Sequence, residues 1–182
     1  LERDAAGNSM EDDYQFSTVA FNPQNPNTIY AKRFRSMDKG RTWTLLPRSI
    51  NALFPGNGSI VYSRGSDAMG CTVYKSTDSG STWSQPLGHF SPCSFGTMAV
   101  DPGDQNRLYV ASRHQGVYVF DGGRWALKAE PEGLRMDHFG QFSLMLVAAD
   151  PRPSSSTVYA AGFAGSLGHS NGVFRSTDRG AS

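Results

Sequence analysis

Three carboxylates, Asp67, Asp137 and Glu132, are the candidates for acid–base chemistry in this sequence. Hydrolysis of a glycosidic bond typically requires two carboxylates about 5 to 10 Å apart, one protonating the leaving group and the other acting as base or nucleophile. Asp67 and Asp137 are the preferred pair, and Glu132 is the substitute. All three fall in segments predicted to be loops, so the fold must bring these loops to one face.

A second group of side chains is suited to holding a ligand rather than cleaving one. Arginine and histidine offer charge and hydrogen bonds, and phenylalanine offers a flat ring for sugar stacking. The predicted ligand-binding residues are Arg64, Phe95, Arg113, His114, His138 and Phe139. All four histidines of the chain, including His89 and His169, fall in the same predicted loops. For each residue taken singly, a solvated loop side chain is the alternative.

The elements that position these loops are indicated by a repeated motif. Residues 36–43 and 76–83 both read S-x-D-x-G-x-T-W, with their tryptophans 40 residues apart. A third copy begins at residue 176, and a decayed copy occupies residues 120–125. The motif residues are Ser36, Asp38, Gly40, Trp43, Ser76, Asp78, Gly80, Trp83, Ser176, Asp178 and Gly180.

Each residue type of this motif has a structural role in a hairpin turn. Glycine supplies a backbone conformation that is costly for other residues, and the aspartate can accept hydrogen bonds from amide groups of the turn. The tryptophan is predicted to begin the outer strand and to bury its ring against the hairpin. We therefore interpret the motif aspartates as structural, not catalytic.

A second element precedes each motif and completes the repeating unit. Proline is followed seven or eight residues later by tyrosine, at Tyr30, Tyr62, Tyr109 and Tyr159. Each unit thus contains four antiparallel strands in about 40 to 50 residues, the size of one propeller blade. The predicted blades span residues 16–49, 50–92, 93–141 and 142–182 of a single partial domain covering 1–182, with the last blade lacking its outer strand.

The motifs resemble the Asp-box (BNR) repeats of sialidase-like propellers, most closely at residues 22–31 and 172–180. Similar repeats occur in xyloglucan-active glycoside hydrolases, sortilin-type receptors and photosystem assembly factors. The resemblance implies an all-β fold, a β-propeller of four-stranded antiparallel blades with Asp-box hairpins, forming an incomplete ring of about four blades. The remaining blades are expected in the same longer chain. No catalytic residue of these families aligns with a position here.

Connection lengths distinguish one face of the predicted ring. Successive turns of a four-stranded meander alternate between two faces, and the proline and motif turns keep nearly constant lengths. The connection before the motif grows from 8 to 16 to 19 residues, counted from tyrosine to motif aspartate. Insertions gathered on one face typically mark the binding face. Its predicted loops are 32–35, 64–70, 88–95, 113–116, 127–141 and 162–171.

The composition of the chain limits the classes of function that we expect. A net charge of +1 over 182 residues gives no electrostatic basis for nucleic-acid binding, and no apolar run is long enough to span a bilayer. We predict no metal and no cofactor. Cys71 and Cys93 either form a disulfide, worth roughly 3 kcal/mol for a loop of about 20 residues, or remain buried thiols.

Two functions remain open at this stage. The first is a binding or scaffold module that holds a glycan or a protein ligand on the long-loop face. The alternative is a glycoside hydrolase of sialidase-like or xyloglucan-active type that uses the loop carboxylates. For either function we expect a secreted, periplasmic or otherwise extracytoplasmic protein.

Overall fold

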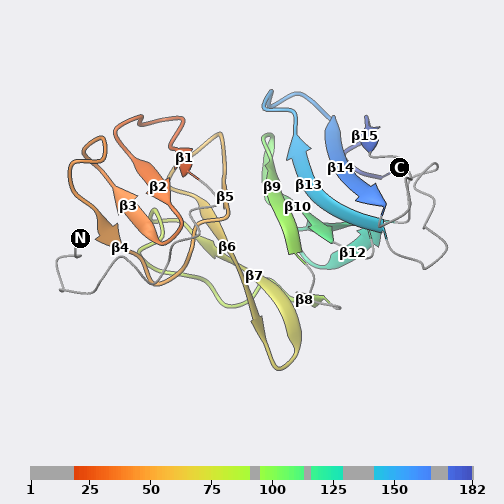
Figure 1. The fold of residues 1–182 in the computed structure, drawn as a ribbon, viewed down its shortest axis with the longest axis horizontal. Helices are drawn as coiled ribbons and strands as arrows, with labels where there is room; N and C mark the ends of the chain where they lie inside the picture. The colour runs from red at the N-terminus through yellow and green to blue at the C-terminus, as the bar shows by residue number, and fades with distance from the viewer. Residues whose placement is uncertain (1–18, 91–94, 113–115, 129–141, 165–171, 182) are drawn as a thin grey trace. The chain divides into compact units, whose positions relative to one another are not determined.

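The computed structural model describes residues 19–90, 95–112, 116–128, 142–164 and 172–181. These residues form fifteen β-strands (Figure 1). Within these ranges no helix is long and apolar enough to cross a membrane. The prediction of an all-β chain is confirmed.

The strands form four antiparallel meanders in which neighbours in sequence are neighbours in the sheet. The first sheet contains β1 (Val19–Phe21), β2 (Ile29–Ala31), β3 (Phe34–Ser36) and β4 (Thr44–Leu45). The second contains β5 (Ala52–Leu53), β6 (Val61–Asp67), β7 (Gly70–Ser76) and β8 (His89–Phe90). The third contains β9 (Phe95–Asp101), β10 (Asp104–Ser112), β11 (Gly116–Asp121) and β12 (Trp125–Lys128). The fourth contains β13 (Phe142–Ala149), β14 (Val158–Ala164) and β15 (Gly172–Ser176).

The chain divides into two compact units. Unit 1 holds the described residues up to Arg64 together with Tyr74–Gln85. Unit 2 holds Gly65–Val73 together with the described residues from Pro86 onward. Strands β6 and β7 contribute to both units, and each unit is described separately below.

The core of unit 1 gathers side chains from the first two sheets and from the link that joins them. Tyr30, Leu46, Ile50 and Val61 are all nearly inaccessible to solvent. Leu46 and Ile50 belong to the link between β4 and β5, so this connection is anchored at two points. Burial of an aliphatic side chain of this size contributes roughly 1.5–3 kcal/mol, which fixes the course of the link.

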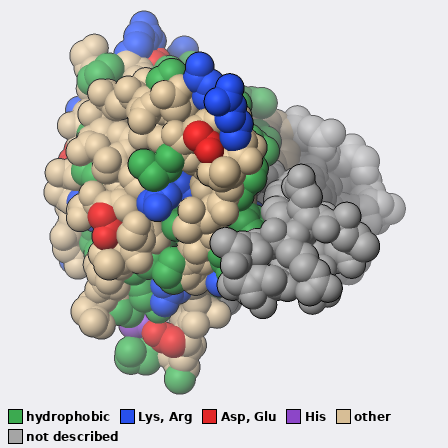
Figure 2. Space-filling model, turned by 90° about the vertical axis from the view of Figure 1, so that its left-hand side faces the viewer, with side chains coloured by type: hydrophobic (Ala, Val, Ile, Leu, Met, Phe, Trp, Pro, Cys, Tyr) green, Lys and Arg blue, Asp and Glu red, His purple; other side chains and the backbone are tan. Residues whose placement is uncertain are grey.

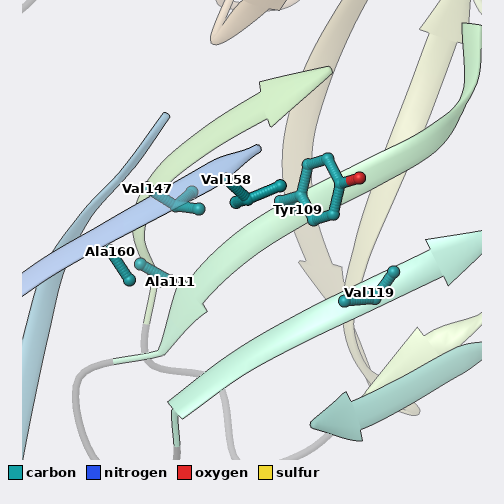
Figure 3. Close-up of a cluster of buried hydrophobic side chains, with 6 residues drawn as sticks. All are labelled: Tyr109, Ala111, Val119, Val147, Val158 and Ala160. Atoms are coloured by element: carbon teal, nitrogen blue, oxygen red, sulfur yellow. The ribbon is translucent and has the colours of Figure 1, made fainter. Parts of the chain in front are cut away.

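The core of unit 2 lies between the third and fourth sheets (Figure 3). Tyr109, Ala111 and Val119 pack with Val147 and with side chains of β14. The sheets are also joined by the Thr97 hydroxyl, which accepts a hydrogen bond from the Val147 N–H at 2.7 Å. Strands β9 and β10 therefore lie directly against β13.

The fourth sheet buries only one of its faces in the described residues. Val147 and Val158 are buried, whereas Leu146, Tyr159 and Val173 are 54%, 40% and 74% exposed. Since successive side chains of a strand point to opposite faces, the second face of this sheet is apolar and open. By contrast, the equivalent tyrosine of the third sheet, Tyr109, is fully buried.

The motif turns hold their shape through internal hydrogen bonds. The Ser36 hydroxyl accepts from the Gly40 N–H at 2.7 Å and donates to Asp38 Oδ1 at 2.8 Å. Asp38 also accepts from the Thr42 N–H and hydroxyl, at 2.8 and 2.6 Å. Gly40 has φ +86°, and its carbonyl accepts from Trp43 Nε1. The same serine–aspartate–glycine bonds recur in the turns at 76–83 and 176–181.

One strand prediction was wrong. Trp83 was expected to begin the outer strand of the second sheet, but β8 begins at His89. The segment between them runs beside β7 with irregular hydrogen bonds, from the Ser84 N–H to the Lys75 carbonyl and from the Leu87 N–H to the Val73 carbonyl. Pro86 lies in this segment and has no N–H to donate, which interrupts a regular ladder.

The structure gives the bonding state of one of the two cysteines. Cys71, which is buried on β7, is disulfide-bonded. Cys93 is the other cysteine of the chain and lies outside the described residues.

Candidate functional site

A pocket of about 320 Å³ opens in unit 1 where three segments meet. These segments are the β2–β3 turn, the link between β4 and β5, and the middle of β6. The lining residues are Lys32, Arg33, Pro47, Arg48, Ser49, Asn51, Ser63 and Arg64. The volume is within the range of about 300–1,000 Å³ typical of small-molecule sites.

The β2–β3 turn is held in place by the link. Lys32 has φ +52°, a left-handed conformation that is uncommon for a residue other than glycine. Its carbonyl accepts a hydrogen bond from the Ile50 N–H at 2.8 Å, and the Arg33 carbonyl accepts one from the Leu46 N–H at 2.7 Å. These bonds join the turn to the two buried anchors of the link, so the pocket has a fixed floor.

Two arginines are positioned by contacts with their surroundings. Arg33 donates from Nε and Nη2 to the Leu46 carbonyl, at 3.3 and 3.2 Å. The Arg48 guanidinium lies 3.4 Å from the centroid of the Tyr74 ring. This cation–π stacking uses the face of the guanidinium, so its N–H donors, which lie in the plane, remain suited to a ligand.

The remaining lining comes from β6 and from Asn51, the last residue of the link before β5. The Arg64 N–H donates to Asn51 Oδ1 at 2.9 Å, which ties the end of the link to the strand. The Ser63 hydroxyl lies beside it and donates to the Arg64 carbonyl at 3.3 Å. Hydroxyl, amide and guanidinium side chains thus belong to this part of the lining.

The charge of the pocket is one-sided. Lys32, Arg33, Arg48 and Arg64 line it, and the lining residues that the structure describes include no Asp or Glu. The face drawn in Figure 2 carries isolated Asp and Glu side chains rather than a continuous acidic patch. The pocket therefore has the electrostatic character of a site for anionic groups.

The structure places the catalytic candidate Asp67 outside this pocket, in unit 2. Asp67 ends β6, so the prediction that it and Arg64 lie on a loop was wrong: the strand continues to Asp67 and the turn is shorter than expected. Asp67 Oδ2 pairs with His89 Nε2 at 2.9 Å. The hydrogen bond from His89, followed by that from the Met69 N–H, lowers the pKa of Asp67, which favours its ionised form.

Phe95 was also expected at the end of a loop but begins β9. Its ring meets that of Phe90 edge to face, with centroids 5.2 Å apart. Phe90 in turn contacts Tyr118 and Trp125. Phe95 is therefore part of an aromatic cluster with Phe90 in unit 2.

The other predicted site residues lie outside the described residues. They are Arg113, His114, Glu132, Asp137, His138 and Phe139, together with His169. The candidate pairing of Asp67 with Asp137 or Glu132 therefore stays a prediction. Where the chain is described, no three His, Cys, Asp or Glu side chains gather in a group that could hold a metal ion.

The motif carboxylates are engaged in their own turns. The Thr42 hydroxyl, and next the Thr42 N–H, stabilise ionised Asp38 and lower its pKa to about 2. Thr82 does the same for Asp78, whose pKa is also about 2. A carboxylate of such low pKa is a poor proton donor near neutral pH.

Sequence reasoning placed Arg64 and the 32–35 turn on the ligand face but did not single out Arg33, Arg48 or Asn51. The link that carries Arg48 and Asn51 is the shortest of its kind, so its length gave no signal. The distribution of charge could have indicated the pocket, because the turn and the link each contribute basic residues to the same predicted face.

Comparisons with known proteins address the fold. No protein-family model matches the chain, and no curated protein matches it. Among solved structures, the chain is similar to a GH74 enzyme of Niastella koreensis, with TM-score 0.64 and 20% identity over 90% of this chain. It is similar to an ancestral GH74 enzyme, with TM-score 0.56 and 21% identity over 80% of this chain. It is also similar to the GH74 xyloglucanase from Xanthomonas campestris, with TM-score 0.50 and 19% identity over 93% of this chain.

The chain has a β-propeller fold. Its antiparallel meanders correspond to propeller blades, as the sequence predicted. The chain spans only 28%, 21% and 38% of the three structures. At these identities the similarity concerns the fold and not the activity.

Proposed function

We propose that this propeller chain is a binding module that holds a glycan or protein ligand on its long-loop face. The observation that carries the proposal is the unit 1 pocket, whose described lining consists mainly of basic and polar side chains and includes no carboxylate. Such a lining supplies hydrogen bonds and charge but no proton donor for bond cleavage. The pocket lies among the connections predicted to form the ligand face.

Binding without turnover is the expected result. The full chain is tested on an immobilised panel of glycans and in pull-downs, and in parallel for release of reducing sugar from the same glycans. Arg48→Ala is expected to weaken capture of any ligand found. Arg41→Ala is the matched control, because Arg41 is an exposed arginine on the motif turn of the same sheet. Capture that is insensitive to Arg48→Ala would place the ligand elsewhere and contradict the proposal.

A glycoside hydrolase is the second candidate, favoured by the similarity to three GH74 enzymes. Ionised Asp67, paired with His89, has the protonation state of a base or nucleophile, and the general acid would have to come from another carboxylate. Turnover of a glycan that disappears in Asp67→Asn, while folding is preserved, would favour this function over the first.

An extracytoplasmic location is part of the proposal. Disulfides form and persist mainly in secreted or periplasmic proteins, and Cys71 is disulfide-bonded. Thiol labelling of the protein isolated from its native compartment is expected to modify no Cys71 until a reductant is added. Labelling before reduction would contradict this location.

We also propose that further blades of the same longer chain cover the open face of the fourth sheet. Leu146, Tyr159 and Val173 form an exposed apolar surface there, and surfaces of this kind promote association. In sedimentation experiments the 182-residue chain is expected to associate, and Val173→Lys to reduce association. A monodisperse monomer over a wide concentration range would contradict the proposal.

A further inference from the structure

We propose that the unit 1 pocket binds an acidic oligosaccharide, whose carboxylate or sulfate groups pair with Arg33 and Arg48. This inference rests on the proposed binding function and names its ligand class. The ligand combines two features: negative charge for the basic side chains and hydroxyl groups for the polar ones.

The charge of the pocket favours an anionic ligand. Four of the described side chains that line this space of about 320 Å³ are basic, and none of the described lining side chains is acidic. The chain as a whole carries a formal net charge of only +1. This local concentration of positive charge is a property of the pocket and not of the whole protein, and it attracts anions at short range.

Two of these cations are pre-organised to recognise a carboxylate or sulfate. Arg33 is anchored through the Leu46 carbonyl and Arg48 through the ring of Tyr74. A guanidinium presents five N–H donors in one plane, so neither contact exhausts its donors. Guanidinium groups held in this way bind planar or tetrahedral anions with paired hydrogen bonds and lose little side-chain entropy.

The remaining lining favours a sugar over a peptide. Ser49, Asn51 and Ser63 offer hydroxyl and amide groups, and Pro47 is the single apolar residue among the described lining residues. Asn51 uses its oxygen to accept from the Arg64 N–H, and its amide nitrogen still carries two donors. Peptide ligands are usually anchored by buried apolar side chains, for which this pocket has no counterpart.

The test compares ligands that differ in one property at a time. The full chain is titrated calorimetrically with a galacturonate oligosaccharide, a sulfated oligosaccharide, a neutral xyloglucan oligosaccharide and an oligoglutamate peptide. Each titration is done at about 0.05 M and about 0.5 M salt, because screening weakens exposed ion pairs. The first two probes distinguish carboxylate from sulfate recognition.

At least one acidic oligosaccharide is expected to bind about tenfold or more tightly than the neutral one, and to lose affinity at high salt. Arg48→Gln is expected to weaken this binding about tenfold or more, the usual range for losing a charge-assisted hydrogen bond. Ser49→Glu, which adds a negative charge to the pocket, should also weaken it. Arg41→Gln is the control, and thermal unfolding verifies that each variant is folded.

Three outcomes would overturn the inference. Equal, salt-independent affinity for neutral and acidic sugars would show that charge is not recognised, while the binding function itself would stand. Tighter binding of oligoglutamate than of any sugar would replace the ligand class. If none of the four probes binds although the glycan panel identifies another ligand, the pocket does not bind acidic oligosaccharides and the inference is wrong. If the panel also captures nothing, the binding function fails as well.

Discussion

The two ends of strand β3 both carry polar side chains but use them differently. At its C-terminal end, Ser36 and the motif aspartate bond to one another and to the turn. At its N-terminal end, Lys32 and Arg33 belong to a turn that is held by backbone bonds, and their side chains line a pocket. Under the proposed function, stability depends mainly on one end and ligand binding on the other.

This difference indicates how a repeated unit can assign stability to one turn and ligand binding to another. A turn whose side chains satisfy each other has little left to offer a ligand. A turn fixed by backbone hydrogen bonds and by buried neighbours does not need bonds between its own side chains to hold its shape. Substitutions at the two ends should therefore separate stability from binding.

The largest effect is expected for Gly80→Ala in the motif turn of the second sheet. Gly80 has φ +88°, and a Cβ there would lie 3.0 Å from Leu46 Cδ1 and 3.1 Å from Ile50 Cδ1. Backbone strain and overpacking together should lower the free energy of unfolding by about 2–4 kcal/mol. Gly40→Ala is the matched comparison, because its nearest neighbours are at 3.6 and 3.9 Å. Equal losses for the two in urea unfolding would show that packing against the link contributes nothing.

A smaller loss is expected for Ser76→Ala. The buried Ser76 hydroxyl accepts from the Gly80 N–H at 2.9 Å and donates to Asp78. Leaving the N–H without this partner should cost about 1–3 kcal/mol in urea unfolding. Thr77→Ala, an exposed position in the same turn, should change the free energy by less than about 0.5 kcal/mol. Similar losses in both variants would contradict the role assigned to the serine.

Acid should weaken the motif turns and leave the pocket turn unaffected. The folded pKa of Asp38 and Asp78 is about 2, below the ordinary value of 3.8. A depressed pKa means that the stabilisation is fully present above about pH 4 and is lost as the pH falls toward 2. The thermal midpoint should fall in that interval, and Asp38→Asn with Asp78→Asn should make it less dependent on pH. An unchanged pH profile in this double variant would contradict the assignment.

The smallest effect on stability is expected for Arg48→Gln. Its guanidinium contacts Tyr74 near the surface, and loss of such a cation–π contact should cost about 0.5–1 kcal/mol in urea unfolding. Ligand affinity should nevertheless fall, as proposed above. A larger loss of stability than that of Ser76→Ala would show that the pocket is also a structural element.

Much of the fold could be predicted from the sequence because its signals are local. The motif turns need glycine, serine and aspartate at fixed positions, and the tyrosine of each second strand marks a buried position in three of the four sheets. The course of the outer strand after Trp83 could not be predicted, because it depends on Pro86 and on irregular bonds to β7. The length of β6 was missed because its second half, Arg64–Asp67, is polar and contains a glycine, a composition typical of a loop, although this segment is part of the strand.

The pocket was only partly predictable. Its face followed from connection lengths, and Arg64 was placed on that face. The roles of Arg33 and Arg48 depend on contacts with the Leu46 carbonyl and the Tyr74 ring. Such contacts join residues far apart in the chain, and no spacing rule predicts them.

The two buried anchors of the link define a three-residue insert. Leu46 and Ile50 are 2% and 3% exposed, and Pro47, Arg48 and Ser49 lie between them at the pocket. Because the anchors fix both ends, the three positions can be exchanged without rebuilding the core. A combinatorial library restricted to residues 47–49 should therefore change ligand selectivity without unfolding the surrounding scaffold. This short segment is thus a natural unit of diversification.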